Sequence, residues 1–218
     1  MIIEKIMTYI FSEVLCMKSV ITIGRQFGCG GREICKKLSE ALNIPFYDRE
    51  LIEYAAAKSG ISPQVLEQYD EKATNSLLYS LSITAYSYAG TGFNTPNLPL
   101  NDQLFISQSD VIKQLADQGP CIILGRCSDY VLKGREDVLN VFIHCDLDIR
   151  IENVIKRLGL PKNKAADIIK KTEKRRASYY NYYTHQKWGD LSNFDLAINS
   201  KSGVDKVVET IINFYKNS

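Results

Sequence analysis

Residues 20–42, "VITIGRQFGCGGREICKKLSEAL", are the most informative segment for predicting the fold. It begins with an apolar run typical of a strand, passes through a glycine-rich turn, and continues into a segment whose apolar residues recur at helical spacing. This order points backbone N–H groups and a helix N-terminus at an anion. We therefore predict a phosphate-binding loop over residues 24–33, with an ordinary tight turn between strand and helix as the alternative.

The loop departs from the strict phosphate-loop pattern GxxxxGK[ST]. With Gly30 as the second glycine, Arg25 takes the first glycine position and Gly31 the lysine position. Arg25 and Arg32 bracket the loop, and an arginine can supply the missing positive charge with a planar fork. Glu33 stands where a magnesium-coordinating hydroxyl is expected. Its carboxylate can bind magnesium through water, or it can be an ordinary first-turn residue favoured by the helix dipole.

The rest of the chain alternates between strand and helix patterns. Five β-rich runs are expected at 20–24, 44–47, 121–124, 138–144 and 194–198, with helical patterns at 32–42, 49–58, 102–118, 148–158, 163–186 and 203–215. This alternation predicts a mostly parallel sheet covered on both faces, with ligands bound beyond the carboxyl ends of the strands. Residues 61–101 interrupt the alternation, and we interpret them as a helical insertion over the site.

Composition narrows the class of protein. The chain has 218 residues, of which 45% are hydrophobic and 24% charged, which is typical of one soluble α/β domain. A net charge of +2 gives no argument for a nucleic-acid or membrane partner. The six cysteines form no CxxC pair, so we expect a reduced, cytoplasmic protein without structural zinc. Residues 1–18 are expected to be an N-terminal helical extension, with Met17 as an alternative start.

Two further strand ends carry candidate site residues. In "GPCIILGRCSDYVL", Arg126 follows an apolar strand next to the expected phosphate loop, where an anionic ligand would explain its position. After the run 44–47, Asp48 is either a helix N-cap or a site residue. Arg49 could contact an acceptor phosphate or pair with Glu53, four residues on.

Two basic helices complete the set of candidates. Arg157 lies near the end of one helical pattern, and Arg175 and Arg176 lie on the next, after a break at Leu160-Pro161. Arginines on such a hinged pair could close over a polyphosphate and neutralise transition-state charge. The alternative is a solvated basic face with tyrosines packed on the body. RNA binding is a minor hypothesis, because the chain has no RNA-binding signature.

Three segments resemble the cytidylate kinase-like proteins of the P-loop nucleoside monophosphate kinase superfamily: "VITIGRQFGCGGREICKKLSEALNIPFYDRELI", "CIILGRCSDYVL" and "KRRASYYNYY…WGDLSNFDLAINS". The resemblance covers residues 19–216. It implies an α/β, three-layer P-loop NTPase fold with a five-stranded parallel sheet, a helical NMP-binding insertion at 49–118 and a helical lid at 157–175. It also implies transfer of the ATP γ-phosphoryl group to a nucleoside monophosphate, CMP or dCMP, with magnesium.

Site residues carried over by the resemblance form three groups. Those expected to bind ATP are Arg25, Gly28, Cys29, Gly30, Gly31, Arg32 and Glu33; those expected to bind the acceptor are Asp48, Arg49 and Arg126; those expected to act in catalysis are Arg32, Arg126, Arg157, Arg175 and Arg176. No metal ligand is assigned.

This chain also departs from cytidylate kinases proper. They read "GKGT" where it reads "GGRE", "GRD" where it has Cys127, and "DSG" where it has Asp48-Arg49-Glu50. A kinase of another small acceptor and a non-catalytic nucleotide-binding regulatory protein are therefore the alternatives. The oligomeric state does not follow from the sequence.

Overall fold

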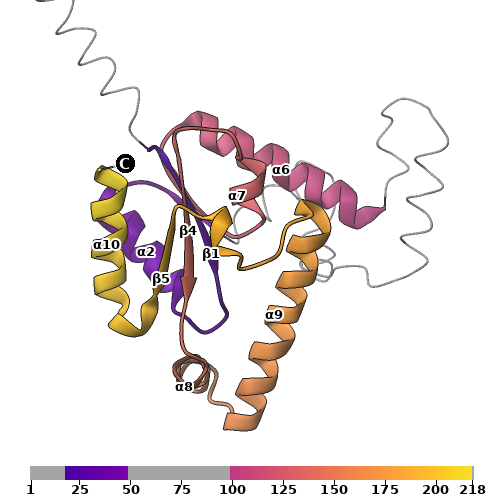
Figure 1. Cartoon of the computed structure of the whole chain (residues 1–218), viewed down its shortest axis with the longest axis vertical. Helices are drawn as coiled ribbons and strands as arrows, with labels where there is room; N and C mark the ends of the chain where they lie inside the picture. Colours follow the sequence, from indigo (N-terminus) through magenta and orange to yellow (C-terminus); the bar gives the residue numbers. More distant parts are fainter. Residues whose placement is uncertain (1–17, 49–98, 218) are drawn as a thin grey trace, which may run out of the picture.

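The computed structural model describes residues 18–48 and 99–217, and its centre is a sheet of five strands (Figure 1). The strands are β1 (Val20–Arg25), β2 (Phe46–Tyr47), β3 (Cys121–Leu124), β4 (Val138–His144) and β5 (Leu196–Asn199). They lie in the order β2-β3-β1-β4-β5, and each neighbouring pair is parallel. The predicted five-stranded parallel sheet is confirmed.

Helices connect the strands. They are α2 (Gly31–Leu42), α6 (Leu100–Gln118), α7 (Ser128–Val131), α8 (Leu147–Leu158), α9 (Lys162–Thr184) and α10 (Val204–Lys216), with short 3-10 turns at η2 (Leu191–Asn193) and η3 (Ser200–Ser202). The helix expected at 49–58, the extension at 1–18 up to residue 17, and the expected insertion up to residue 98 lie outside the described residues. Within the described part of the chain, no helix has the length and apolar character needed to cross a membrane.

The helices cover both faces of the sheet and make three layers, as expected (Figure 1). Successive strand residues point to opposite faces, so Ile122 packs with α2 and α10 while Ile123 packs with α6. Both faces are buried, which explains why the strand "CIIL" is apolar throughout. Val111 and Ile112 of α6 belong to the same buried hydrophobic cluster as Ile123 of β3. The end of the segment expected as an insertion is therefore part of the central domain.

The segment expected as a lid lies beyond the carboxyl ends of the strands. It runs from the end of α8 through a turn at Gly159, where φ is 65°, into the first half of α9. In Figure 1, α8 lies past the carboxyl end of β4, and α9 passes beside the sheet. This arrangement brings α8 and α9 to the edge of the sheet where the turn between β1 and α2 lies.

Candidate active site at the carboxyl edge of the sheet

The turn between β1 and α2 has the backbone of an anion-binding loop. Gly28 and Gly30 have φ values of 88° and 80°, a left-handed conformation that favours glycine. A Cβ on Gly28 would lie 2.8 Å from the carbonyl oxygen of Arg150, so the loop packs directly on α8. Because Gly30 has no side chain, it cannot cap the first N–H groups of α2. Those groups are therefore suited to bind an external anion.

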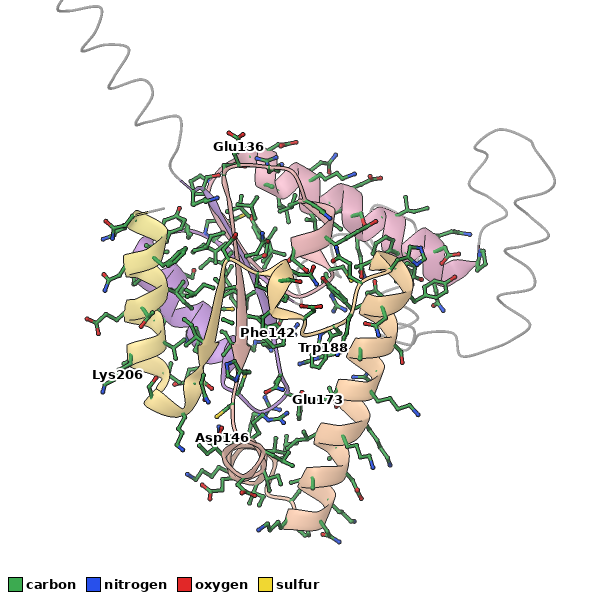
Figure 2. All side chains as sticks on the ribbon, in the orientation of Figure 1. Glu136, Phe142, Asp146, Glu173, Trp188 and Lys206 are labelled. Carbon is green, nitrogen blue, oxygen red and sulfur yellow. The ribbon has the colours of Figure 1, made fainter. Side chains whose placement is uncertain are left out.

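Two side chains from elsewhere in the fold, and one of the loop's own, hold this loop. The amide of Phe27 donates to Oε1 of Glu173 in α9 at 2.9 Å. Asn153 Nδ2, in α8, donates to the carbonyl of Gly28 at 2.9 Å. Gln26 Oε1 accepts from the amide of Cys145, at the end of β4, at 3.0 Å. Figure 2 shows Glu173 projecting from α9 toward the sheet's carboxyl edge. The loop conformation is thus fixed by contacts with both α8 and α9.

A cavity lies beside the loop, between the carboxyl ends of β1 and β3 and the second half of α9. Its walls are Gly24, Arg25, Gly125, Arg126, Cys127, Asp129, Phe142, Arg176, Tyr179, Tyr180, Trp188 and Phe194. Three arginines therefore meet there, and all are only half-buried. Guanidinium groups arranged in this way form charge-assisted hydrogen bonds to phosphate or carboxylate oxygens. The cavity is suited to an anionic ligand.

Arg126 reaches the cavity from an unusual turn. Gly125, Arg126 and Cys127 have φ values of 77°, 60° and 55°, so three successive residues are left-handed. For the two that are not glycine, this conformation costs about 1–2 kcal/mol each. Backbone strain of this kind is concentrated at functional sites. It turns the chain sharply at the end of β3, and Arg126 faces the cavity while Cys127 is buried.

Asp129 belongs to the same cavity and was missed by the sequence analysis. Its Oδ2 accepts a hydrogen bond from the hydroxyl of Tyr180 at 2.6 Å. Burial raises the pKa of Asp129, and the bond from Tyr180 lowers it in part. The signal was present, because Asp129 follows Arg126 by only three positions at the end of the same strand.

Aromatic rings form the floor of the cavity. The ring of Phe142 lies 5.8 Å from that of Trp188 and 5.0 Å from that of Phe194, centroid to centroid. Figure 2 shows Phe142 and Trp188 between the sheet and α9. A Cβ on Gly24 would lie 2.9 Å from the Phe142 ring, so only glycine leaves room for this packing. The sequence did not reveal this group of aromatic rings, because the rings come from segments far apart in the chain.

The remaining predicted residues lie around this centre. The side chain of Arg32 is 65% exposed, and its Nε lies 3.7 Å from Oδ2 of Asp48. The guanidinium of Arg157 lies 5.0 Å from the centroid of the Phe27 ring, and that of Arg176 lies 5.6 Å from it. Arg175 is exposed on α9. Arg49 lies outside the described residues.

Cys29 lies in the loop as a buried thiol. Burial raises the pKa of Cys29, which outweighs the opposite effect of Arg25 and Arg176. The thiol is therefore neutral, and Cys29 can bind an anion through its backbone but is not a nucleophile. The five cysteines in residues 18–48 and 99–217 are all buried.

The loop and the adjoining cavity are suited to phosphate groups. The glycine backbone, the N-terminus of α2 and the three arginines all suit phosphate oxygens. Within the described ranges, no three His, Cys, Asp or Glu side chains are grouped to hold a metal ion. Magnesium accompanying ATP would take its ligands from phosphate oxygens and water, with Glu33, exposed in the first turn of α2, as a contact through water.

Comparison with known proteins identifies relatives of this chain. The model of the cytidylate kinase-like family matches residues 20–202. A crystal structure of an uncharacterized protein from Eubacterium ventriosum is 27% identical, with a TM-score of 0.68, over 91% of this chain and 99% of that chain. A gluconokinase from Sinorhizobium meliloti shares the fold at 12% identity and a TM-score of 0.50, over 91% of this chain and 92% of its own. Among curated proteins, none matches significantly.

Proposed function

Since the chain belongs to the cytidylate kinase-like family, we propose that it is an ATP-dependent phosphotransferase whose acceptor is a nucleoside monophosphate, with CMP and dCMP the first candidates. One observation carries this proposal: Arg25, Arg126 and Arg176 meet in a cavity beside a glycine loop that opens a helix. Two anionic groups, one on the loop and one in the cavity, can lie side by side there.

The backbone N–H groups of Gly28–Gly31 and the N-terminus of α2 bind the ATP phosphates. Arg126 and Arg176 bind the acceptor phosphate and neutralise charge as it develops during transfer. Bound ATP supplies the transferable phosphoryl group, and its magnesium neutralises phosphate charge. The phosphate oxygen of a nucleoside monophosphate is already a nucleophile, so this reaction rests on positioning and charge and needs no strong base.

The outer residues complete this scheme. Arg157 and Arg175, on α8 and α9, are proposed to contact phosphates when the segment 157–175 closes over bound nucleotide. Asp48, which follows β2, is proposed as an acceptor contact, and Arg32 orients it through their 3.7 Å ion pair. Arg49, outside the described residues, is proposed as a second acceptor contact.

A hydroxyl acceptor is the second candidate, and Asp129 favours it. Transfer to a hydroxyl needs a general base within reach. Asp48 is not placed to act as this base, because it pairs with Arg32 and is not part of the cavity wall. Asp129 does line the cavity, and burial raises its pKa toward the range useful for a base.

A coupled assay of ADP release with Mg-ATP distinguishes these functions. The panel contains nucleoside monophosphates, their deoxy forms, and small phosphorylated or hydroxylated metabolites. Turnover confined to CMP and dCMP is the expected result, whereas turnover with a hydroxylated metabolite alone supports the second candidate. If no acceptor on the panel is turned over while calorimetry still shows ATP binding, both candidate functions are contradicted. That result supports a non-catalytic nucleotide-binding protein.

A further inference from the structure

We propose that Arg25 supplies the positive charge that a lysine supplies in the strict phosphate-loop pattern, and that residue 31 is glycine because the stem of Arg25 fills the space its side chain would need. The cation is thus delivered from the end of β1 and not from the first turn of α2. This inference rests on the proposed function, since it assumes that the loop binds the phosphates of ATP.

Arg25 and Gly31 are packed too closely for a side chain at position 31 to fit without a shift. A Cβ built on Gly31 would lie 3.0 Å from Cγ of Arg25 and 3.3 Å from its Cβ. These separations are closer than ordinary van der Waals contact, and the atoms belong to the stem of Arg25, near its fixed backbone. Arg25 pairs with Ile143 of β4 in the sheet, so its Cα cannot easily withdraw. A lysine at position 31 would therefore force the stem of Arg25 to shift.

The guanidinium of Arg25 lies where its charge can reach bound phosphates. Its Nη1 lies 2.1 Å from the position that a Cβ on Gly125 would take, so the guanidinium lies directly over Gly125. This is the turn that also presents Arg126. The guanidinium of Arg25 therefore lies between the glycine loop and the acceptor side of the cavity. A charge in that place can contact the phosphates on the loop and the group being transferred.

Arg32, the other cation beside the loop, has a different environment. Its side chain is 65% exposed and its nearest recorded partner is Asp48, at 3.7 Å. It is not part of the cavity wall, whereas Arg25 is. Arg25 is further tied to α9, because its carbonyl oxygen accepts a hydrogen bond from Nη1 of Arg176 at 3.1 Å. Of the two arginines that bracket the loop, the structure assigns the lysine's role to Arg25.

Binding of Mg-ATP and of inorganic pyrophosphate tests the proposal. Calorimetry gives the Kd, and the fluorescence of Trp188, the single tryptophan, reports occupation of the cavity that it lines. We expect Arg25→Ala to raise both Kd values by about tenfold or more, and Arg25→Lys by less. Arg32→Ala should change them by less than about threefold, as should the charge control Lys36→Ala on the exposed face of α2.

A pair of variants tests the exchange between positions 25 and 31. Gly31→Lys alone should weaken binding, because the lysine side chain and Arg25 then compete for the same space. The double variant R25G/G31K, which restores the glycine and lysine of the strict pattern, should recover binding to within about threefold of the original protein. Thermal unfolding of every variant separates lost binding from lost folding.

The outcomes are distinct. Nucleotide binding that survives Arg25→Ala, or that falls equally with Arg32→Ala, overturns this inference and leaves the proposed function standing. If R25G/G31K does not recover binding, the claim that Arg25 and a lysine at position 31 can replace each other is overturned. If Arg25→Ala weakens pyrophosphate binding but no acceptor is phosphorylated, the inference holds and the kinase proposal falls. If the original protein binds neither probe, both fall.

Discussion

Glu173 Oε2 lies 3.0 Å from Nη1 of Arg150, while its Oε1 accepts the amide hydrogen of Phe27 at 2.9 Å. One carboxylate thus links α9, α8 and the glycine loop. The side chains of Arg150 and Glu173 are only 9% and 20% exposed. Among the described residues, Nη1 and Nε of Arg150 have no well-aligned hydrogen-bond partner, so charge holds this pair together.

Replacing Glu173 by glutamine should destabilise the protein by about 3 kcal/mol, because it leaves Arg150 as a buried charge without its counter-ion. Glutamine keeps an oxygen for the Phe27 amide, so the loss comes mainly from the charge. In urea unfolding, the double variant E173Q/R150M should be more stable than E173Q. The exposed pair of Asp146 and Lys201, 3.2 Å apart, is the control, and Asp146→Asn should destabilise the protein much less than Glu173→Gln does. A double variant less stable than E173Q would contradict this account.

Replacing Arg126 by alanine should lower kcat for the preferred acceptor by about 10²- to 10³-fold, because Arg126, which lines the cavity, is proposed to contact charge that develops in the transition state. Arg126→Lys should restore part of the rate, since lysine keeps the charge but not the planar fork. ADP release under saturating Mg-ATP measures both. Lys206→Ala, exposed on α10, serves as the control and should retain the original rate. Full activity in Arg126→Ala would remove this residue from the reaction.

Replacing Tyr180 by phenylalanine should raise the pKa of Asp129 further, because the hydroxyl that donates to Asp129 lowers that pKa. A group whose pKa is raised by folding costs stability as pH rises above its unfolded pKa. The stability lost in Tyr180→Phe should therefore grow as pH rises through the pKa of Asp129, which melting curves across pH would measure.

The pH dependence of kcat/KM tests whether Asp129 acts as a general base. If Asp129 is the base for a hydroxyl acceptor, the acid limb of kcat/KM in Tyr180→Phe moves to higher pH. If the acceptor is a phosphate, that limb stays in place. Tyr215→Phe is the matched control, since the Tyr215 hydroxyl donates to the carbonyl of Ser19. A shift of the limb in both variants would contradict a specific role for Asp129.

A second acid-sensitive contact lies at the opposite edge of the sheet. Arg135 donates to both carboxylate oxygens of Asp137 at 2.9 Å, and these bonds lower the pKa of Asp137 to about 2. The stabilisation is present above the ordinary carboxyl pKa of about 3.9 and is lost as pH falls toward 2. Asp137→Asn should cost about 1 kcal/mol at pH 7 and almost nothing near pH 2. Urea unfolding at both pH values measures this, and an equal cost at both would contradict it.

The local elements of this fold could be predicted from the sequence because they depend on short-range patterns. Apolar runs and helical spacing report which residues are buried, and all five predicted strands are present. The glycine-rich turn could be recognised because Gly28 and Gly30 adopt φ values that other residues avoid. Arg126 could be proposed because it ends a strand of a parallel sheet, where ligands bind.

Local sequence patterns are therefore enough to predict a parallel α/β sheet with a phosphate-type loop after its first strand. They do not predict which charges meet at that loop. Strand order places β3 beside β1, so Arg25 and Arg126 share a cavity although they are far apart in the chain. Successive residues of an α-helix are rotated by about 100° around the helix axis. On α9, Arg176 therefore faces that cavity while Arg175 faces solvent. Strand neighbours and helix rotation are set by packing of the whole domain, which local patterns do not report.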